Sequence, residues 1–115
     1  MRRIGFTVGA LWNNGTNNGL WIEHTNGGNY ILQSRNNNSD STIDSQVAAA
    51  NGVFHNLEIR CDNDGLTIEF IVDGVSKGVI TTNIYTGGME FRMSNSVVTT
   101  GNGMDIDKIW IAQDA

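Results

Sequence analysis

The sequence predicts an all-β protein, an antiparallel sandwich of two sheets, and three observations support this. Several short runs alternate apolar and polar residues, which is typical of strands with one buried face. Asn-Gly and Asp-Gly turn signals separate these runs. Finally, 14 Gly, no Pro and many Asn, Ser and Thr suit a turn-rich β domain. With 115 residues, we expect a single domain over 1–115.

The first strand is expected near the N-terminus, where Ile4, Phe6 and Val8 share one parity. Residues 9–19 form an Asn- and Gly-rich loop whose apolar Leu11 and Trp12 should fold back onto the sheet. Residues 20–25 and 29–35 then form a hairpin around the turn at 26–28. In its first strand, Trp21 and Glu23 lie on the parity opposite to Leu20, Ile22 and His24.

A polar loop tip is expected at 36–40, followed by a strand over 41–47 with Ile43 and Val47 on one side. A short helical turn is the alternative for this region, because three consecutive alanines follow at 48–50.

Residues 53–81 are the clearest β segment and predict a meander of three strands. Turns of Asn63-Asp64-Gly65 and Asp73-Gly74 separate the strands and supply the positive φ that tight hairpins require. Two sets of residues share the expected buried parity, namely Val53, His55, Leu57, Ile59 and Cys61, then Leu66, Ile68, Phe70 and Val72.

Two more strands are expected towards the C-terminus. In the first, Met89, Phe91 and Met93 alternate with polar residues, and the last spans residues 104–112. Trp110, in the last strand, should pack against its own sheet or a subunit partner.

Charge, hydropathy and cysteine content argue against nucleic-acid binding, membrane insertion and an internal disulfide. A net charge of -5 with only 7 Lys and Arg argues against nucleic acid as a partner, because that affinity rests largely on cationic contacts. No apolar run is long enough to insert into a membrane, and we expect no signal peptide. Cys61, the single cysteine, cannot form an internal disulfide, and its parity predicts a small core residue.

Three motifs give the sequence a family resemblance: Phe54-His55-Asn56-Leu57-Glu58-Ile59, Phe70-Ile71-Val72-Asp73-Gly74 and Met104-Asp105-Ile106-Asp107-Lys108-Ile109-Trp110-Ile111. In these the chain resembles the concanavalin A-like, laminin-G-like jelly-roll group. Phe54 stands where that pattern has Trp, one aromatic core residue in place of another. The family fold also has strands before the position of Ile4, which predicts either a C-terminal fragment of a longer protein or completion by oligomerisation.

The resemblance and the composition together suggest a bacteriophage tail fibre or tailspike tip domain. Such domains are similar to lectins, and the resemblance implies a homo-oligomer, with a trimer favoured, that binds host-surface polysaccharide or stabilises the fibre. The expected location is the virion tail, after assembly in the host cytoplasm. A trimerisation or assembly-chaperone cap without sugar binding, and a cellular lectin-like carbohydrate-binding module, are the alternatives.

Catalysis is not expected, and neither is a cofactor or metal. Retaining glycosidases need two carboxylates about 5 to 5.5 Å apart, and the paired-Glu strand motif of this fold is missing. Asp105 and Asp107 share a face, but Asp107 suits a structural role and Asp105 a solvated position, and His55 suits the core. The stretch 62–65 begins like a calcium loop but lacks the distal Glu, so it is better interpreted as a hairpin turn.

Sugar binding is the favoured activity, since sugars are held by an aromatic plate and adjoining amide and carboxylate groups. The pair of Trp21 with Glu23 on an outward parity is the strongest local signal. The structural alternative is that Trp21 packs on a neighbouring strand while the Asn residues build turns. The predicted glycan-binding residues are Trp12, Trp21, Glu23, Tyr30, Arg35, Asn36 and Asn37.

Overall fold

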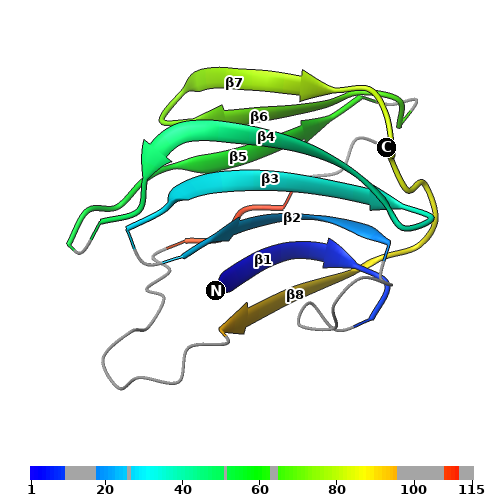
Figure 1. Cartoon of the computed structure of the whole chain (residues 1–115), viewed down its shortest axis with the longest axis horizontal. Coiled ribbons are helices and arrows are strands. Elements are labelled where there is room, and N and C mark those ends of the chain that lie inside the picture. The colour runs from blue at the N-terminus through cyan, green and yellow to red at the C-terminus, as the bar shows by residue number, and fades with distance from the viewer. Residues whose placement is uncertain (10–17, 26, 51, 63–64, 96–107, 112–115) are drawn as a thin grey trace.

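The computed structural model describes residues 1–9, 18–25, 27–50, 52–62, 65–95 and 108–111. Two antiparallel sheets pack face to face, and none of the described residues is helical (Figure 1). The strands are β1 (Arg2–Thr7), β2 (Gly19–His24), β3 (Asn29–Asn36), β4 (Ser39–Ala48), β5 (Leu57–Cys61), β6 (Ile68–Val72), β7 (Val75–Ile80) and β8 (Glu90–Asn95). The predicted all-β sandwich is confirmed. No helix of the described chain is long and apolar enough to cross a membrane.

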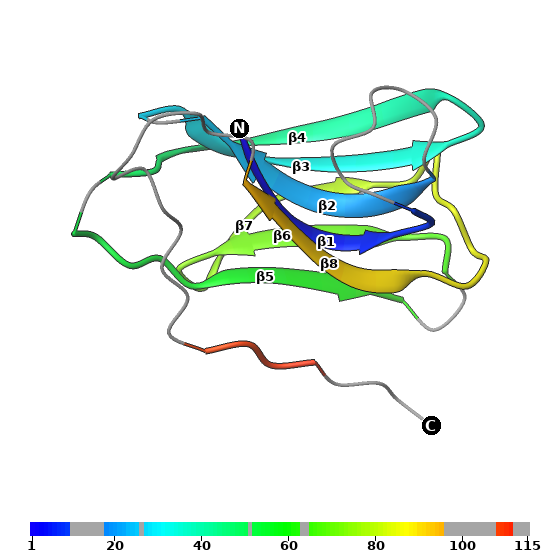
Figure 2. The ribbon, with the colours of Figure 1, turned by 90° about the horizontal axis from the view of Figure 1, so that it is seen from below.

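The larger sheet has the order β4-β3-β2-β1-β8, and the smaller has the order β5-β6-β7 (Figure 2). All described pairings are antiparallel. The smaller sheet is the predicted meander of residues 53–81. Its second turn has positive φ at both Asp73 (51°) and Gly74 (80°), the backbone that a two-residue primed hairpin requires.

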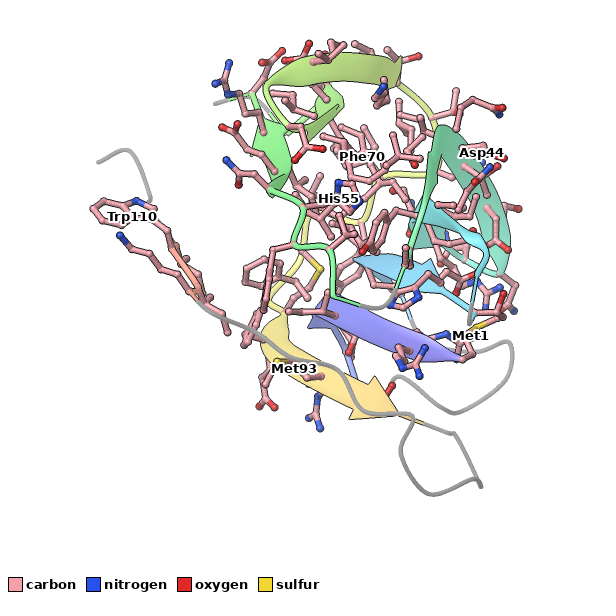
Figure 3. All side chains as sticks on the ribbon, turned by 90° about the vertical axis from the view of Figure 1, so that its left-hand side faces the viewer. Met1, Asp44, His55, Phe70, Met93 and Trp110 are labelled. Atoms are coloured by element: carbon pink, nitrogen blue, oxygen red, sulfur yellow. The ribbon has the colours of Figure 1, made fainter. Side chains whose placement is uncertain are left out.

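The core lies between the sheets and consists of inward residues from both. Phe70 and Leu32 have no exposed surface, and Figure 3 shows Phe70 enclosed between the two layers. The buried cluster contains Leu20, Ile22, Leu32, Ile68, Phe70, Val72 and Ile80. Those in β2 and β6 follow the predicted parity, because period-2 alternation along a strand sends them to one face of its sheet.

The β3–β4 connection is tighter than the predicted loop over 36–40. Asn36 and Ser39 pair across the hairpin, so only Asn37 and Asn38 form the turn. Both have positive φ, 52° and 64°, which Asn tolerates better than most residues. The predicted strand over 41–47 is confirmed, because β4 continues to Ala48 instead of giving way to a helical turn.

Several predicted burials are wrong at the ends of the smaller sheet. β5 begins only at Leu57, so Val53 and Phe54 precede it and are exposed, as is Leu66 before β6. Phe54 is therefore not an aromatic core residue. Cys61 is also exposed, because it lies at the end of an edge strand. Inward parity buries a side chain only where the opposite sheet covers it.

The predicted C-terminal strand is also not formed where the structure describes it. Residues 108–111 belong to neither sheet, and Trp110 is 78% exposed (Figure 3). Trp110 therefore does not pack against its own sheet. Residues 104–107 lie outside the described chain.

Candidate functional site

The outward face of the larger sheet carries three of the predicted binding residues together. Ile22 pairs with Leu32 inside the core, so neighbours Trp21, Glu23 and Gln33 project from the opposite face. Arg35 joins them two residues further along β3. We call Arg3, Trp21, Glu23, Gln33, Arg35 and Asp40 the outer cluster.

Glu23 is the centre of the outer cluster. Its Oε2 accepts hydrogen bonds from Arg3 Nε and Trp21 Nε1, both at 3.0 Å. Its Oε1 accepts a third from Gln33 Nε2 at 3.1 Å. Only 12% of the Glu23 side chain is exposed. The carboxylate is therefore occupied by neighbours on three strands and ties them together.

Trp21 is not the exposed aromatic plate that the sequence predicts, because it is only 6% exposed. It lies opposite Gly5 on β1, and the guanidinium carbon of Arg35 lies 5.7 Å from the ring centroid. These contacts match the structural alternative, in which Trp21 packs on neighbouring strands. A sugar could stack on the indole only if the Arg35 side chain moved.

Arg35 is held in turn by Asp40 across the β3–β4 hairpin. Arg35 Nη2 donates to Asp40 Oδ2 at 2.7 Å, and Arg35 Nε donates to Asp40 Oδ1. The hydrogen bonds from Arg35 lower the pKa of Asp40, and the same contact raises the pKa of Arg35. The bidentate pair fixes the guanidinium beside Trp21.

The other predicted residues are dispersed. Asn36 ends β3, and the backbone N–H of Asn37 donates to Asn18 Oδ1 at 2.9 Å. Tyr30 lies at the opposite end of β3 and on its inward parity, packed against the core. Trp12 lies outside the described residues. The structure thus joins Trp21, Glu23 and Arg35, and separates Tyr30 from them.

A second polar cluster, unexpected from the sequence, surrounds Tyr30. The ring centroids of His24 and His55 lie 5.0 Å and 5.6 Å from that of Tyr30, in edge-on arrangements. Burial lowers the pKa of His24 and raises that of Tyr30, with Asp73 adding to the rise for Tyr30. The alternation along each strand is enough to predict that His24 and Tyr30 point inward. Their contact could not be predicted in this way, because it depends on the pairing of β2 with β3.

Asp73 connects this cluster to the β6–β7 turn. Its Oδ2 lies 2.7 Å from His55 Nδ1, and its Oδ1 accepts the backbone N–H of Asn56 at 2.8 Å. Asp73 N–H donates to the Asn56 carbonyl at 2.8 Å. This contact with His55 and the Asn56 N–H lowers the pKa of Asp73. These contacts hold the chain segment just before β5 against the β6–β7 turn.

A cavity of about 320 Å³ opens between the sheets at the other end of the sandwich. Although Cys61 as a residue is exposed, it lines this cavity, and the partial burial of its thiol there raises the pKa of the thiol, which disfavours the reactive thiolate. The cavity is lined by Gly19, Leu20, Ser34, Cys61, Gly65, Ile68, Ile84, Tyr85, Thr86, Gly87 and Met89. In the described part of the chain, no three His, Cys, Asp or Glu side chains gather as metal ligands would.

Apolar side chains are exposed where the two sheets do not overlap. Phe91 and Met93 lie on the inward face of β8, opposite Phe6 and Ile4 of β1, and both are exposed. Ile109, Trp110 and Ile111 are exposed on the nearby C-terminal segment (Figure 3). The backbones of the two sheets come closest where β4 lies beside β6 and β7, whereas β1 and β8 lie away from β6 and β7 (Figure 1). The β1–β8 side therefore presents apolar surface to its surroundings.

Comparison with known proteins gives no match to this chain among family models, curated proteins or solved structures.

Proposed function

We propose that this domain is a non-catalytic assembly module that stabilises a homo-oligomer at the tip of a viral fibre. The architecture belongs, in this proposal, to the concanavalin A-like jelly rolls of bacteriophage tail fibres and tailspikes, with the virion tail as its location. The all-β sandwich and the Asn-, Ser- and Thr-rich composition support it. A trimer is the expected assembly.

The exposed apolar surface beside β8 carries this proposal. Met93 is 48% exposed although it has the inward parity of its strand, and Phe91 beside it is exposed as well. Apolar surface gathered on one side of a small domain is typical of an association site. Fully burying a Phe or Met side chain contributes about 1.5 to 3 kcal/mol, and because Phe91 and Met93 are 37% and 48% exposed, covering each would contribute roughly 0.5 to 1.5 kcal/mol.

Sedimentation velocity of the purified domain tests the proposal. We expect the wild type to sediment as a homo-oligomer and Phe91→Ser/Met93→Ser to shift towards monomer. The control is Val75→Ser/Val79→Ser, which removes two exposed aliphatic residues from β7, an edge strand of the smaller sheet. A wild-type protein that stays monomeric at tens of micromolar contradicts an assembly function.

Glycan binding at the outer cluster is the second candidate. Within the described chain, Gln33 Oε1 is buried without a hydrogen-bond partner, and Arg35 lies two residues further along the same face of β3. An acceptor beside a cation suits a hydroxyl-rich or acidic saccharide. On a glycan array, Arg35→Ala should lose binding while Arg60→Ala, on the other sheet, keeps it. Unchanged binding and folding after Trp21→Ala would exclude this site.

A further inference from the structure

The free edge of β5 and the segment 108–111 have complementary features. β5 is an edge strand of the smaller sheet, while 108–111 carries exposed apolar side chains and has no partner strand within the described chain. We propose that residues 108–111 of one copy add as an antiparallel strand to β5 of a second copy. This inference rests on the assembly function proposed above and names the contact that builds the oligomer.

Within the described residues, the backbone groups of β5 that point away from β6 identify the positions that accept the strand. Asp73 N–H donates to the Asn56 carbonyl, and Asp62 N–H donates to the Thr67 carbonyl. The backbone N–H and C=O groups of the even-numbered residues of β5 therefore point towards β6. In an antiparallel ladder the intervening residues direct their N–H and C=O groups to the other side. Leu57, Ile59 and Cys61 therefore present theirs at the open edge.

The direction of 108–111 indicates that the strand comes from another copy. Figures 1 and 2 show this segment running in the same direction as β5 and apart from it. All described pairings in both sheets are antiparallel. To pair antiparallel with β5 of its own chain, the segment 108–111 would have to reverse its direction. In a second copy that is rotated relative to the first, the same segment runs antiparallel to β5 without any reversal.

The two faces of the segment fit the two faces of β5. Lys108 Nζ lies 5.4 Å from the centroid of the Trp110 ring, so these side chains share one face and leave Ile109 and Ile111 on the other. Ile59 and Leu57 pack against the core, while Glu58 and Arg60 form an ion pair on the outer face. With Ile109 and Ile111 inward, the added strand extends the core towards exposed Phe91 and Met93 of β8.

Charge selects one register. When Ile111 lies opposite Ile59, Ile109 lies opposite Cys61 and both outer pairs are attractive. Trp110 then faces the Arg60 guanidinium, and Lys108 faces Asp62. Shifting by two residues in one direction sets Lys108 against Arg60, and in the other leaves only Ile111 opposite a residue of β5, Cys61. Because the outer pairs occupy non-hydrogen-bonded positions, where side chains are closest, these pairings have the largest effect.

This contact joins two different surfaces, the β5 edge and the C-terminal segment, so it is heterologous. Such contacts form closed rings when the rotation between copies closes. Two copies exchanging strands, or three in a ring as expected for a fibre tip, use the β5 edge and the C-terminal segment of every copy. Sedimentation gives the number.

Disulfide trapping tests the contact directly. In a Cys61→Ser background, one protein carries Ile59→Cys and another carries Ile111→Cys. After mixing and mild oxidation, we expect a covalent heterodimer on a non-reducing gel. The control pair replaces Ile59→Cys with Val79→Cys on the opposite edge and should give none. The double variant Ile59→Cys/Ile111→Cys distinguishes the alternatives, because an intramolecular disulfide in a monomer would overturn the proposal, as would no cross-link.

Charge reversal provides an independent measurement. Lys108→Glu and Asp62→Lys should each weaken association by about fivefold, and the double variant should restore it. Absence of restoration contradicts the register. If the wild type is oligomeric but neither cross-linking nor charge reversal has an effect, only this inference fails. If the wild type is monomeric, the assembly function fails as well.

Discussion

Gly5 of β1 lies directly opposite Trp21 of β2, and the two strands approach unusually closely at this pair. A Cβ added at Gly5 would lie 2.5 Å from Trp21 Cα and 2.2 Å from the Leu20 carbonyl oxygen. Neither atom can move without shifting β2. The close approach helps to bury Trp21. The aromatic residue that gave the strongest sequence signal for sugar binding therefore packs within the outer face of the sheet.

Gly5→Ala should therefore destabilise the domain by about 1 to 3 kcal/mol, because the new methyl group meets backbone atoms. Urea unfolding followed by tryptophan fluorescence measures the change. Gly88→Ala is the matched control, since an added Cβ there has no atom within 4 Å. Equal stability of the two variants would show that β1 and β2 are not so close.

Glu23→Gln keeps the shape of the side chain but removes the charge that Arg3 and Trp21 contact. We expect a loss of about 1.5 to 3 kcal/mol, the contribution of hydrogen bonds to a charged group. The control is Glu58→Gln, which breaks the exposed pair with Arg60 and should leave the unfolding free energy nearly unchanged. Similar losses in both variants would contradict a central role for Glu23.

Asp73→Asn should make the stability of the domain less dependent on pH. Its contacts with His55 and the Asn56 N–H lower the pKa of Asp73 below the ordinary 3.8. A depressed carboxyl pKa contributes stability above the unfolded pKa, and this contribution is lost as pH falls through the folded pKa. The urea midpoints of wild type and Asp73→Asn should therefore differ at pH 7, and by less at a pH below 3.8. A constant difference at both pH values would argue against this linkage.

Phe70→Ala should cost about 3 to 5 kcal/mol, because the side chain is fully buried between the sheets and its removal leaves a cavity. Phe54→Ala makes the same chemical change at an exposed position before β5 and should alter the unfolding free energy by less than about 0.5 kcal/mol. Thermal unfolding of both variants measures the contrast. A large loss at Phe54 would indicate that this ring is covered in solution.

Local patterns were sufficient for most of the strands. The alternation in 20–25 and 66–73 correctly gave the inward faces of β2 and β6, apart from Leu66, and Asp73-Gly74 correctly gave a tight turn. These features depend on neighbouring residues alone, since backbone pleating and turn φ are local properties. The same reasoning placed Trp21 and Glu23 on one outward face.

What the sequence determined by itself was the all-β sandwich, the parity of its strands and the adjacency of Trp21 and Glu23. The tertiary structure decided that Trp21 is buried, that Tyr30 lies with His24 and His55, and that Phe54 and Cys61 are exposed. Exposure depends on what the opposite sheet or the neighbouring strand places over a side chain. Alternation along one strand specifies which face of the sheet a side chain lies on. It does not specify whether another sheet or strand covers that side chain.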